Sequence, residues 1–147
     1  MTTENSNIER PEYYGYFVTH AYMSQIQRGI QAAHVIQQMY GKMEDSTPIA
    51  QEAFREWATQ DFTMIVLNGG NSAMLQNSYH QSYEADEDGS FPIARFFEDS
   101  QSMEGMMTAW GIVLPSTCKL SEDDDPFGEY SRDQEIYYTV LANLKLA

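Results

Sequence analysis

The chain has 147 residues, 42% of them hydrophobic, which is enough for one folded domain with a core of its own. Its 22 acidic residues outnumber its 8 lysines and arginines and give a net charge of -14, which disfavours a broad nucleic-acid-binding surface. A single cysteine excludes an internal disulfide bond and fits a reducing compartment, so we expect a cytoplasmic protein. The apolar runs are too short to span a bilayer, so we expect no membrane segment.

The first elements of the chain are expected to be a strand and then a helix. Residues 1–12 are predicted to be a flexible lead-in, and the aromatic and β-branched residues 13–20 predict a strand. Ser24 suits the N-cap of a helix, and Gly41 is a natural end for it. The residues predicted to share one face of this helix are Gly29, Ala33, Ile36 and Tyr40.

The rest of the chain continues the alternation of helices and strands. Pro48 favours the first turn of a second helix, and Pro115 is expected to end the last strand. The elements predicted after the first helix are a helix over 48–57, a strand over 62–67, a helix over 72–83, strands over 91–97 and 106–114, and a helix over 133–146. The apolar stripe of the last helix is predicted to be Ile136, Val140, Leu141 and Leu144.

This order of elements, β-α-(α)-β-α-β-β-α, predicts a sheet covered by helices on both faces. The fold class we expect is therefore α/β, a three-layer α-β-α sandwich around a four-stranded mixed sheet. The third and fourth strands are close enough in the sequence to be antiparallel neighbours. Since neither an internal repeat nor a break in composition divides the chain, residues 13–147 are expected to form a single domain.

Residue types that bind metals or cofactors do not form a recognisable set. His20, His34 and His80 lack the spacing of metal ligands, and Cys118 stands alone, so we predict neither a metal site nor a cofactor. Residues 68–72 follow a predicted strand and open a helix, where backbone N–H groups can hold a phosphate. Their sequence lacks the pattern of a phosphate-binding loop, so we interpret them as a tight turn with Ser72 as the helix cap.

Three segments carry the residue types that can do chemistry. The first is the helix start around Gly29 and His34, where the small residues are expected to let the helix pack tightly on the sheet. The second is the loop over 97–108, in which Asp99 stands at a strand end, where a carboxylate can act as a base or orient a water molecule. The third is the strand that begins at Thr108, whose hydroxyl can donate a hydrogen bond.

These segments resemble the type II peptidyl-tRNA hydrolase family. Members of that family have a helix that begins G-K-x-A-A-Q, then a loop with an aspartate, a G-x-x-T pattern and a strand of the form T-x-x-G-I. The matching segments here are Gly29-Ile-Gln-Ala-Ala-His34, Asp99, Gly105-Met-Met-Thr108 and Thr108-Ala-Trp-Gly-Ile112. The resemblance extends over residues 13 to 146 in the same order of elements. It implies a mixed four-stranded sheet between helices and hydrolysis of the ester bond between peptide and tRNA.

Two positions depart from the family pattern, since the family's catalytic lysine falls at Ile30 and its glutamine falls at His34. Hydrolysis of this ester requires an activated water and stabilisation of the developing oxyanion. The resemblance implies that Asp99 helps to activate the water, whereas the oxyanion would depend on Thr108, on backbone N–H groups or on Arg28. His34 is either a substitute base near neutral pH or a polar residue at the helix edge.

The function that we favour from the sequence is a non-catalytic binding module, because loss of an electrostatic catalytic group costs about 2.7–4 kcal/mol of transition-state stabilisation. Its acidic half, residues 84–135, is expected to bind a basic protein surface. The aromatic residues expected to be exposed and to anchor such a contact are Tyr79, Tyr83, Phe127 and Tyr130.

The alternative function is that of a diverged peptidyl-tRNA hydrolase. Its catalytic residues would be Asp99, Thr108 and, if the site is active, His34. Its binding residues would be Arg28, Gly29, Ile30 and Gly105. The net charge of -14 disfavours tRNA as a partner, because it opposes the approach of phosphates. A third hypothesis places a small anion at the helix start near Gly29.

Overall fold

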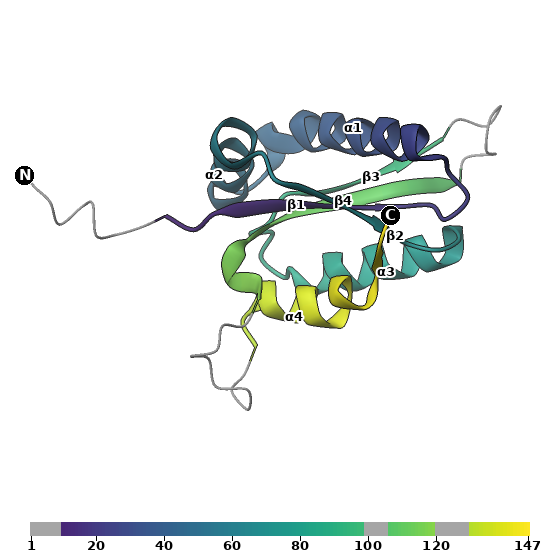
Figure 1. Ribbon diagram of the computed structural model, residues 1–147. Helices are drawn as coiled ribbons and strands as arrows, with labels where there is room; N and C mark the ends of the chain where they lie inside the picture. The colour runs from purple at the N-terminus through teal and green to yellow at the C-terminus, as the bar shows by residue number, and fades with distance from the viewer. Residues whose placement is uncertain (1–9, 99–105, 120–129) are drawn as a thin grey trace, which may run out of the picture.

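The computed structural model describes residues 10–98, 106–119 and 130–147, and in this part of the chain one mixed sheet of five strands lies between helices (Figure 1). The strands are β1 (Tyr13–Thr19), β2 (Met64–Asn68), β3 (Ile93–Phe97), β4 (Met107–Pro115) and β5 (Lys145–Leu146). Their order across the sheet is β3-β4-β1-β2-β5; β1 and β2 are parallel, and the other neighbours are antiparallel. The mixed α/β fold and the antiparallel pairing of the third and fourth strands are thus confirmed.

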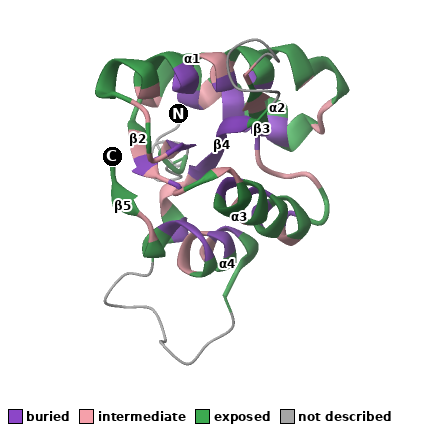
Figure 2. Ribbon diagram, turned by 90° about the vertical axis from the view of Figure 1, so that its right-hand side faces the viewer, coloured by how far each residue is buried: buried purple, intermediate pink, exposed green. Residues whose placement is uncertain are grey.

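Helices cover both faces of the sheet. The α-helices in the described residues are α1 (Gln25–Lys42), α2 (Pro48–Glu56), α3 (Ser72–Ala85) and α4 (Arg132–Thr139). In Figure 1, α1 and α2 lie on one side of the sheet, and α3 and α4 lie on the other. Each pair closes its own hydrophobic cluster against the strands, and Figure 2 shows the buried residues concentrated there.

Side chains cap the helix starts, as local rules predict. Ser24 accepts a hydrogen bond from the backbone N–H of Gln27, so the predicted N-cap of α1 is confirmed. The cap of α3 is Asn71, not the expected Ser72. Gly41 does not end α1, because the helix runs on to Lys42 and continues into a 3-10 turn.

The face of α1 that packs on the sheet differs from the predicted one. Gly29, Ala33 and Tyr40 are exposed and Ile36 is half-buried, so that prediction is wrong. The buried residues of α1 are Gln31, Ala32, Val35 and Met39. Ala32, Val35 and Met39 repeat every three to four residues and form the apolar stripe that meets the sheet.

The close approach of α1 to the sheet depends on Gly111 of β4. A methyl group at this position would lie 2.7 Å from Phe17 and 3.0 Å from Val35, which is too short for ordinary packing. Gly29, which we expected to fill this role, has no atom within 4 Å of the space where a side chain would begin. The small residue that lets helix and sheet meet is therefore in the strand.

The prediction of a four-stranded sheet is wrong, because the end of the chain forms a fifth strand. We expected one helix up to residue 146, but α4 ends at Thr139 and a 3-10 turn over Leu141–Asn143 follows. Two β-branched residues, Thr139 and Val140, disfavour a longer helix. The Asn143 side chain also donates a hydrogen bond to the carbonyl oxygen of Thr139 at 3.2 Å. The chain then turns back, and β5 pairs with the outer edge of β2.

The apolar stripe predicted for this region is nevertheless part of the core. Ile136, Val140 and Leu141 are buried, and Leu144 packs against them half-buried. A short strand therefore replaces the end of the helix without changing which side chains face the sheet. None of the helices in the described residues is both long enough and apolar enough to cross a membrane.

We predict that Gly111→Ala lowers the free energy of unfolding by about 1–3 kcal/mol, because the added methyl group overfills the contact with Phe17 and Val35. Gly29→Ala is the matched control. It should raise stability by about 0.5–1 kcal/mol, since glycine is a poor residue in the middle of an exposed helix. Urea unfolding of both variants measures the effect, and an unchanged stability of Gly111→Ala would contradict the packing described.

Candidate functional site

Residues from all three segments singled out in the sequence meet where β3 ends and β4 begins, beside α1. The hydroxyl of Thr108 is fully buried and donates a hydrogen bond to Oε1 of Gln31 at 2.7 Å. Nε2 of Gln31 in turn donates to Oε2 of Glu98 at 2.9 Å. The Gln31 carboxamide thus connects a buried hydroxyl on the sheet with a half-buried carboxylate at the strand end.

This arrangement limits what Thr108 can do. A threonine hydroxyl has one hydrogen, and here Gln31 accepts it. Thr108 is therefore not free to donate to a developing oxyanion unless its bond to Gln31 breaks. Leaving the buried carboxamide oxygen without a partner would cost about 1–3 kcal/mol.

Arg28, the cation closest in the sequence to Ile30, is held by the loop between β1 and α1. Its Nη2 donates to the carbonyl oxygen of Ala21 at 3.0 Å, and its Nε donates to that of Met23 at 3.1 Å. Burial, and to a smaller degree the positive charge of Arg28, hold the pKa of His20 below its ordinary value. The contacts of this guanidinium group fix the entry to α1.

The position that the resemblance gives to the catalytic lysine is at the surface. Ile30 is 49% exposed, and its neighbour Gly29 is exposed as well. The anion site hypothesised at Gly29 gains no support, because Ser24 and Gln27 already form a capping box at this helix start.

His34 lies against β3. Its ring stacks on that of Phe96 with centroids 4.5 Å apart, and its Nδ1 is 3.0 Å from Oε1 of Gln37. These contacts fit the interpretation of His34 as a polar residue at the helix edge. Asp99 and Gly105, the other residues expected in the site, lie outside the described residues.

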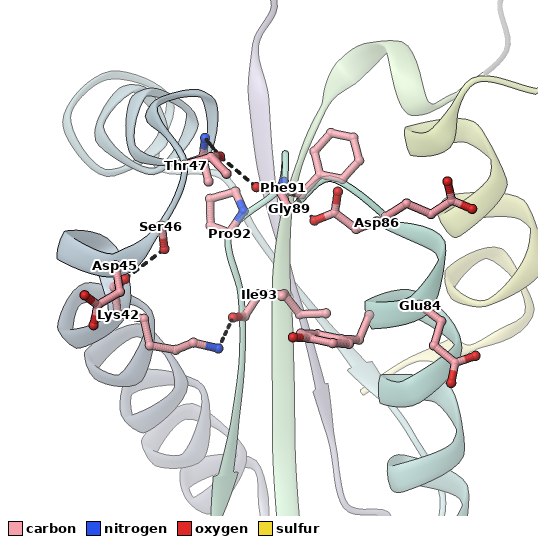
Figure 3. Close-up of a pocket in the computed structure, with 13 residues that line it drawn as sticks. Lys42, Asp45, Ser46, Thr47, Glu84, Asp86, Gly89, Phe91, Pro92 and Ile93 are labelled. Carbon is pink, nitrogen blue, oxygen red and sulfur yellow. Dashed lines mark hydrogen bonds between the residues drawn. The ribbon is translucent and has the colours of Figure 1, made fainter.

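A cleft that the sequence did not indicate lies between the α1–α2 connection and the end of α3 (Figure 3). It has a volume of about 420 Å³. The carboxylate residues that line it are Asp45, Glu84, Asp86 and Glu87. Lys42, on the α1 side, donates to the carbonyl oxygen of Ile93 at 3.2 Å, and Figure 3 shows this bond. Burial, and next the charge of Arg95, lower the pKa of Lys42.

The acidic run over residues 84–88, at the end of α3, is only partly exposed to solvent. Asp86 is buried and accepts hydrogen bonds from the backbone N–H groups of Ser90 at 2.8 Å and Phe91 at 3.0 Å. Burial raises the pKa of Asp86. Glu84 and Glu87 are exposed at the rim of the cleft, where Arg132 forms an ion pair with Glu87 at 3.8 Å. Among the described residues Glu84 has no such partner, so the rim keeps negative charge there.

Of the aromatic residues proposed as anchors, the structure shows two exposed and one buried. Tyr83 lines the cleft and is 54% exposed, and Tyr130 is also exposed. The expectation for Tyr79 is wrong, because the residue is buried and its ring meets that of Trp110 edge to face, with ring centres 6.1 Å apart. Phe127 lies outside the described residues.

Gln31 and Glu98 were missed as members of the site. The available signal for Gln31 is its place four residues before Val35, on the face of α1 that is otherwise apolar. A polar residue at such a position needs a partner, since burying an amide without a hydrogen bond is costly. The sequence did not show that this partner is Thr108.

The described residues contain no group of three or more histidine, cysteine, aspartate or glutamate side chains placed to hold a metal ion. Cys118 is buried, and burial raises the pKa of its thiol, which makes it a poor nucleophile. No model of a known protein family matches the chain, and no curated protein matches its sequence. The resemblance to type II peptidyl-tRNA hydrolases therefore rests on the motifs given above.

We predict that Gln31→Leu and Thr108→Val each lower the free energy of unfolding by about 1–3 kcal/mol, because each leaves a buried polar group without its partner. The double variant should lose less than the sum of the two, by about 0.5–3 kcal/mol. Urea unfolding of the four proteins provides the measurement. Gln38→Leu, on the exposed side of α1, is the control, and strict additivity would show that the two side chains are not coupled.

Proposed function

We propose that this chain is a non-catalytic binding module on a fold like that of type II peptidyl-tRNA hydrolases, and that it binds a basic protein surface. The observation that carries the proposal is Ile30, an exposed aliphatic residue at the position that the resemblance gives to the catalytic lysine. An aliphatic side chain cannot stabilise an oxyanion, and such a loss costs about 2.7–4 kcal/mol. The buried single cysteine leads us to propose a cytoplasmic location as well.

The neighbouring polar groups support this proposal, because each already has a structural role. Arg28 holds the loop before α1, and the hydroxyl of Thr108 is bonded to Gln31. A guanidinium group bonded to two backbone carbonyls is not a simple substitute for a lysine ammonium group, since its geometry and reach differ.

The acidic cleft supports the choice of partner. Glu84 leaves negative charge at its rim, Glu87 lies beside it in an exposed ion pair with Arg132, and the exposed ring of Tyr83 offers a flat apolar surface there. Lysine and arginine side chains combine a charged head with an apolar stem, so they suit this combination of carboxylates and an aromatic ring. The net charge of -14 favours the approach of such a partner from a distance.

The second candidate function, hydrolysis of peptidyl-tRNA, is favoured by one observation. The chain of hydrogen bonds from Thr108 through Gln31 ends at Glu98, next to Asp99 in the sequence. The carboxylate of Glu98, just after β3, provides a base for water activation. This function needs an oxyanion donor that Ile30 does not provide, so we place it second.

We predict that an oligolysine peptide binds the protein and that its affinity falls steeply as the salt concentration rises. The double variant Glu84→Gln/Glu87→Gln should bind about threefold or more weakly, because surface charge contacts contribute up to about 1 kcal/mol each. Fluorescence anisotropy of a labelled peptide at several salt concentrations measures both effects.

The matched control is Glu12→Gln/Glu135→Gln, which removes the same charge from exposed positions that do not line the cleft. It should bind like the unchanged protein. Affinity that is independent of salt, or an equal loss in the two double variants, would contradict a contact at the cleft.

A further inference from the structure

The strand β3 has one unpaired side. It lies at the edge of the sheet, and β4 is its neighbour on the other side. Lys42 covers part of the free side by donating to the carbonyl oxygen of Ile93 at 3.2 Å. Proteins block unwanted strand pairing with charged side chains at the edge or by covering the edge with a helix, and Lys42 reaches the edge from the end of α1. Here it blocks only the start of β3.

Beyond Ile93, the backbone of β3 offers hydrogen-bonding groups to a further strand. In an antiparallel pair, successive residues direct their N–H and C=O groups alternately toward and away from the partner. The carbonyl of Pro92 accepts from Val113, and the N–H of Glu98 donates to the chain just before β4. Arg95 and Phe97 therefore direct their backbone groups away from β4. Among the described residues, none bonds to these groups on the free side.

A groove of about 510 Å³ runs along this edge, between α1 and α3. Three side chains that can carry positive charge, Lys42, His80 and Arg95, line it. The described residues that line the groove include no carboxylate, and in the described part of the chain neither Lys42 nor Arg95 forms an ion pair. The groove is thus lined by basic side chains on a chain whose net charge is -14.

The aromatic side chains of the groove hold Arg95 in place. Its guanidinium carbon lies 5.0 Å from the ring centre of Tyr79 and 5.1 Å from that of Phe97. Tyr83 stacks beside Tyr79 with ring centres 5.8 Å apart. Arg95 is exposed, so the rings fix its direction while its hydrogen-bond donors remain accessible.

We propose that the free edge of β3 binds an extended acidic peptide segment of a partner protein, which adds a sixth strand to the sheet beside Arg95 and Phe97. The backbone groups of these two residues bond to the added strand, and its acidic side chain lies opposite Arg95. An apolar residue two positions away packs on Phe97, which is 40% exposed. This surface adjoins the acidic cleft, with which it shares Lys42 and Tyr83, but the peptide bonds to Arg95 and Phe97, which do not line the cleft. The proposal therefore stands whether or not the cleft binds a basic partner.

Charge argues against two other occupants. Pairing of β3 with β3 of a second copy would bring one Arg95 close to the other and would join two chains of net charge -14. A single-stranded nucleic acid would meet the same long-range repulsion, and its sugar–phosphate backbone has no N–H groups for the carbonyls of Arg95 and Phe97. A peptide with one carboxylate among uncharged residues can bond to the free backbone groups of β3 and place its carboxylate opposite Arg95.

The test uses the full chain and a labelled, blocked peptide of sequence Thr-Val-Thr-Glu-Thr-Val-Thr. In either strand direction, this peptide can place glutamate opposite Arg95 and valine opposite Phe97. A second peptide has lysine in place of the glutamate. The unchanged protein should bind the glutamate peptide about fivefold or more tightly than the lysine peptide. Arg95→Glu should reverse this preference, whereas Lys145→Glu, on β5 at the opposite edge of the sheet, should leave it unchanged.

Reversal by Arg95→Glu also shows that the variant is folded, since a disordered variant would lose both peptides. Amide hydrogen exchange gives the second readout: the N–H groups of Arg95 and Phe97 should exchange more slowly in the saturated complex. The proposal is overturned by the absence of binding at millimolar peptide, by equal affinity for the two peptides, or by binding without slower exchange at these amides. Displacement of the peptide by single-stranded DNA, or dimerisation through this edge, would overturn it as well.

Discussion

The hydrogen bond between Thr108 and Gln31 holds α1 on the sheet and occupies the one hydrogen of the Thr108 hydroxyl. It joins the buried face of α1 to the first residues of β4, at the place where the sequence motifs suggest an active site. Because both groups are buried, each needs the other, and breaking the pair leaves an amide or a hydroxyl without a partner. The polar groups of the site therefore serve first to fix α1 on the sheet. Arg28 has a similar role in the loop before that helix.

Local features of the fold could be predicted from the sequence, whereas long-range ones could not. Ser24 and Pro48 mark helix starts correctly, since capping and the fixed backbone of proline act within one turn. The strand β5 has two residues, too few for any periodicity, and it forms because β2 has a free edge. The role of Gly111 also depends on distant residues, because Phe17 and Val35 fill the space beside it.

In the candidate site too, local features could be predicted from the sequence and long-range contacts could not. Thr108 could be chosen from the sequence, but its partner Gln31 could not, because 77 positions separate them. The net charge of -14 likewise does not reveal that two surfaces of opposite sign adjoin. Lys42 and Tyr83 line both the acidic cleft and the positive groove along β3. A protein with two such neighbouring surfaces is suited to binding a partner that itself carries both charges.

The most direct test of the claim that this scaffold binds without catalysis is a single-turnover assay with peptidyl-tRNA and the protein in large excess. Release of the peptide is followed over time beside a buffer blank. The structure around Ile30 and Thr108 leads us to expect release at the rate of the blank. Faster release that Asp99→Asn abolishes would contradict the account and would show that the site is an active one.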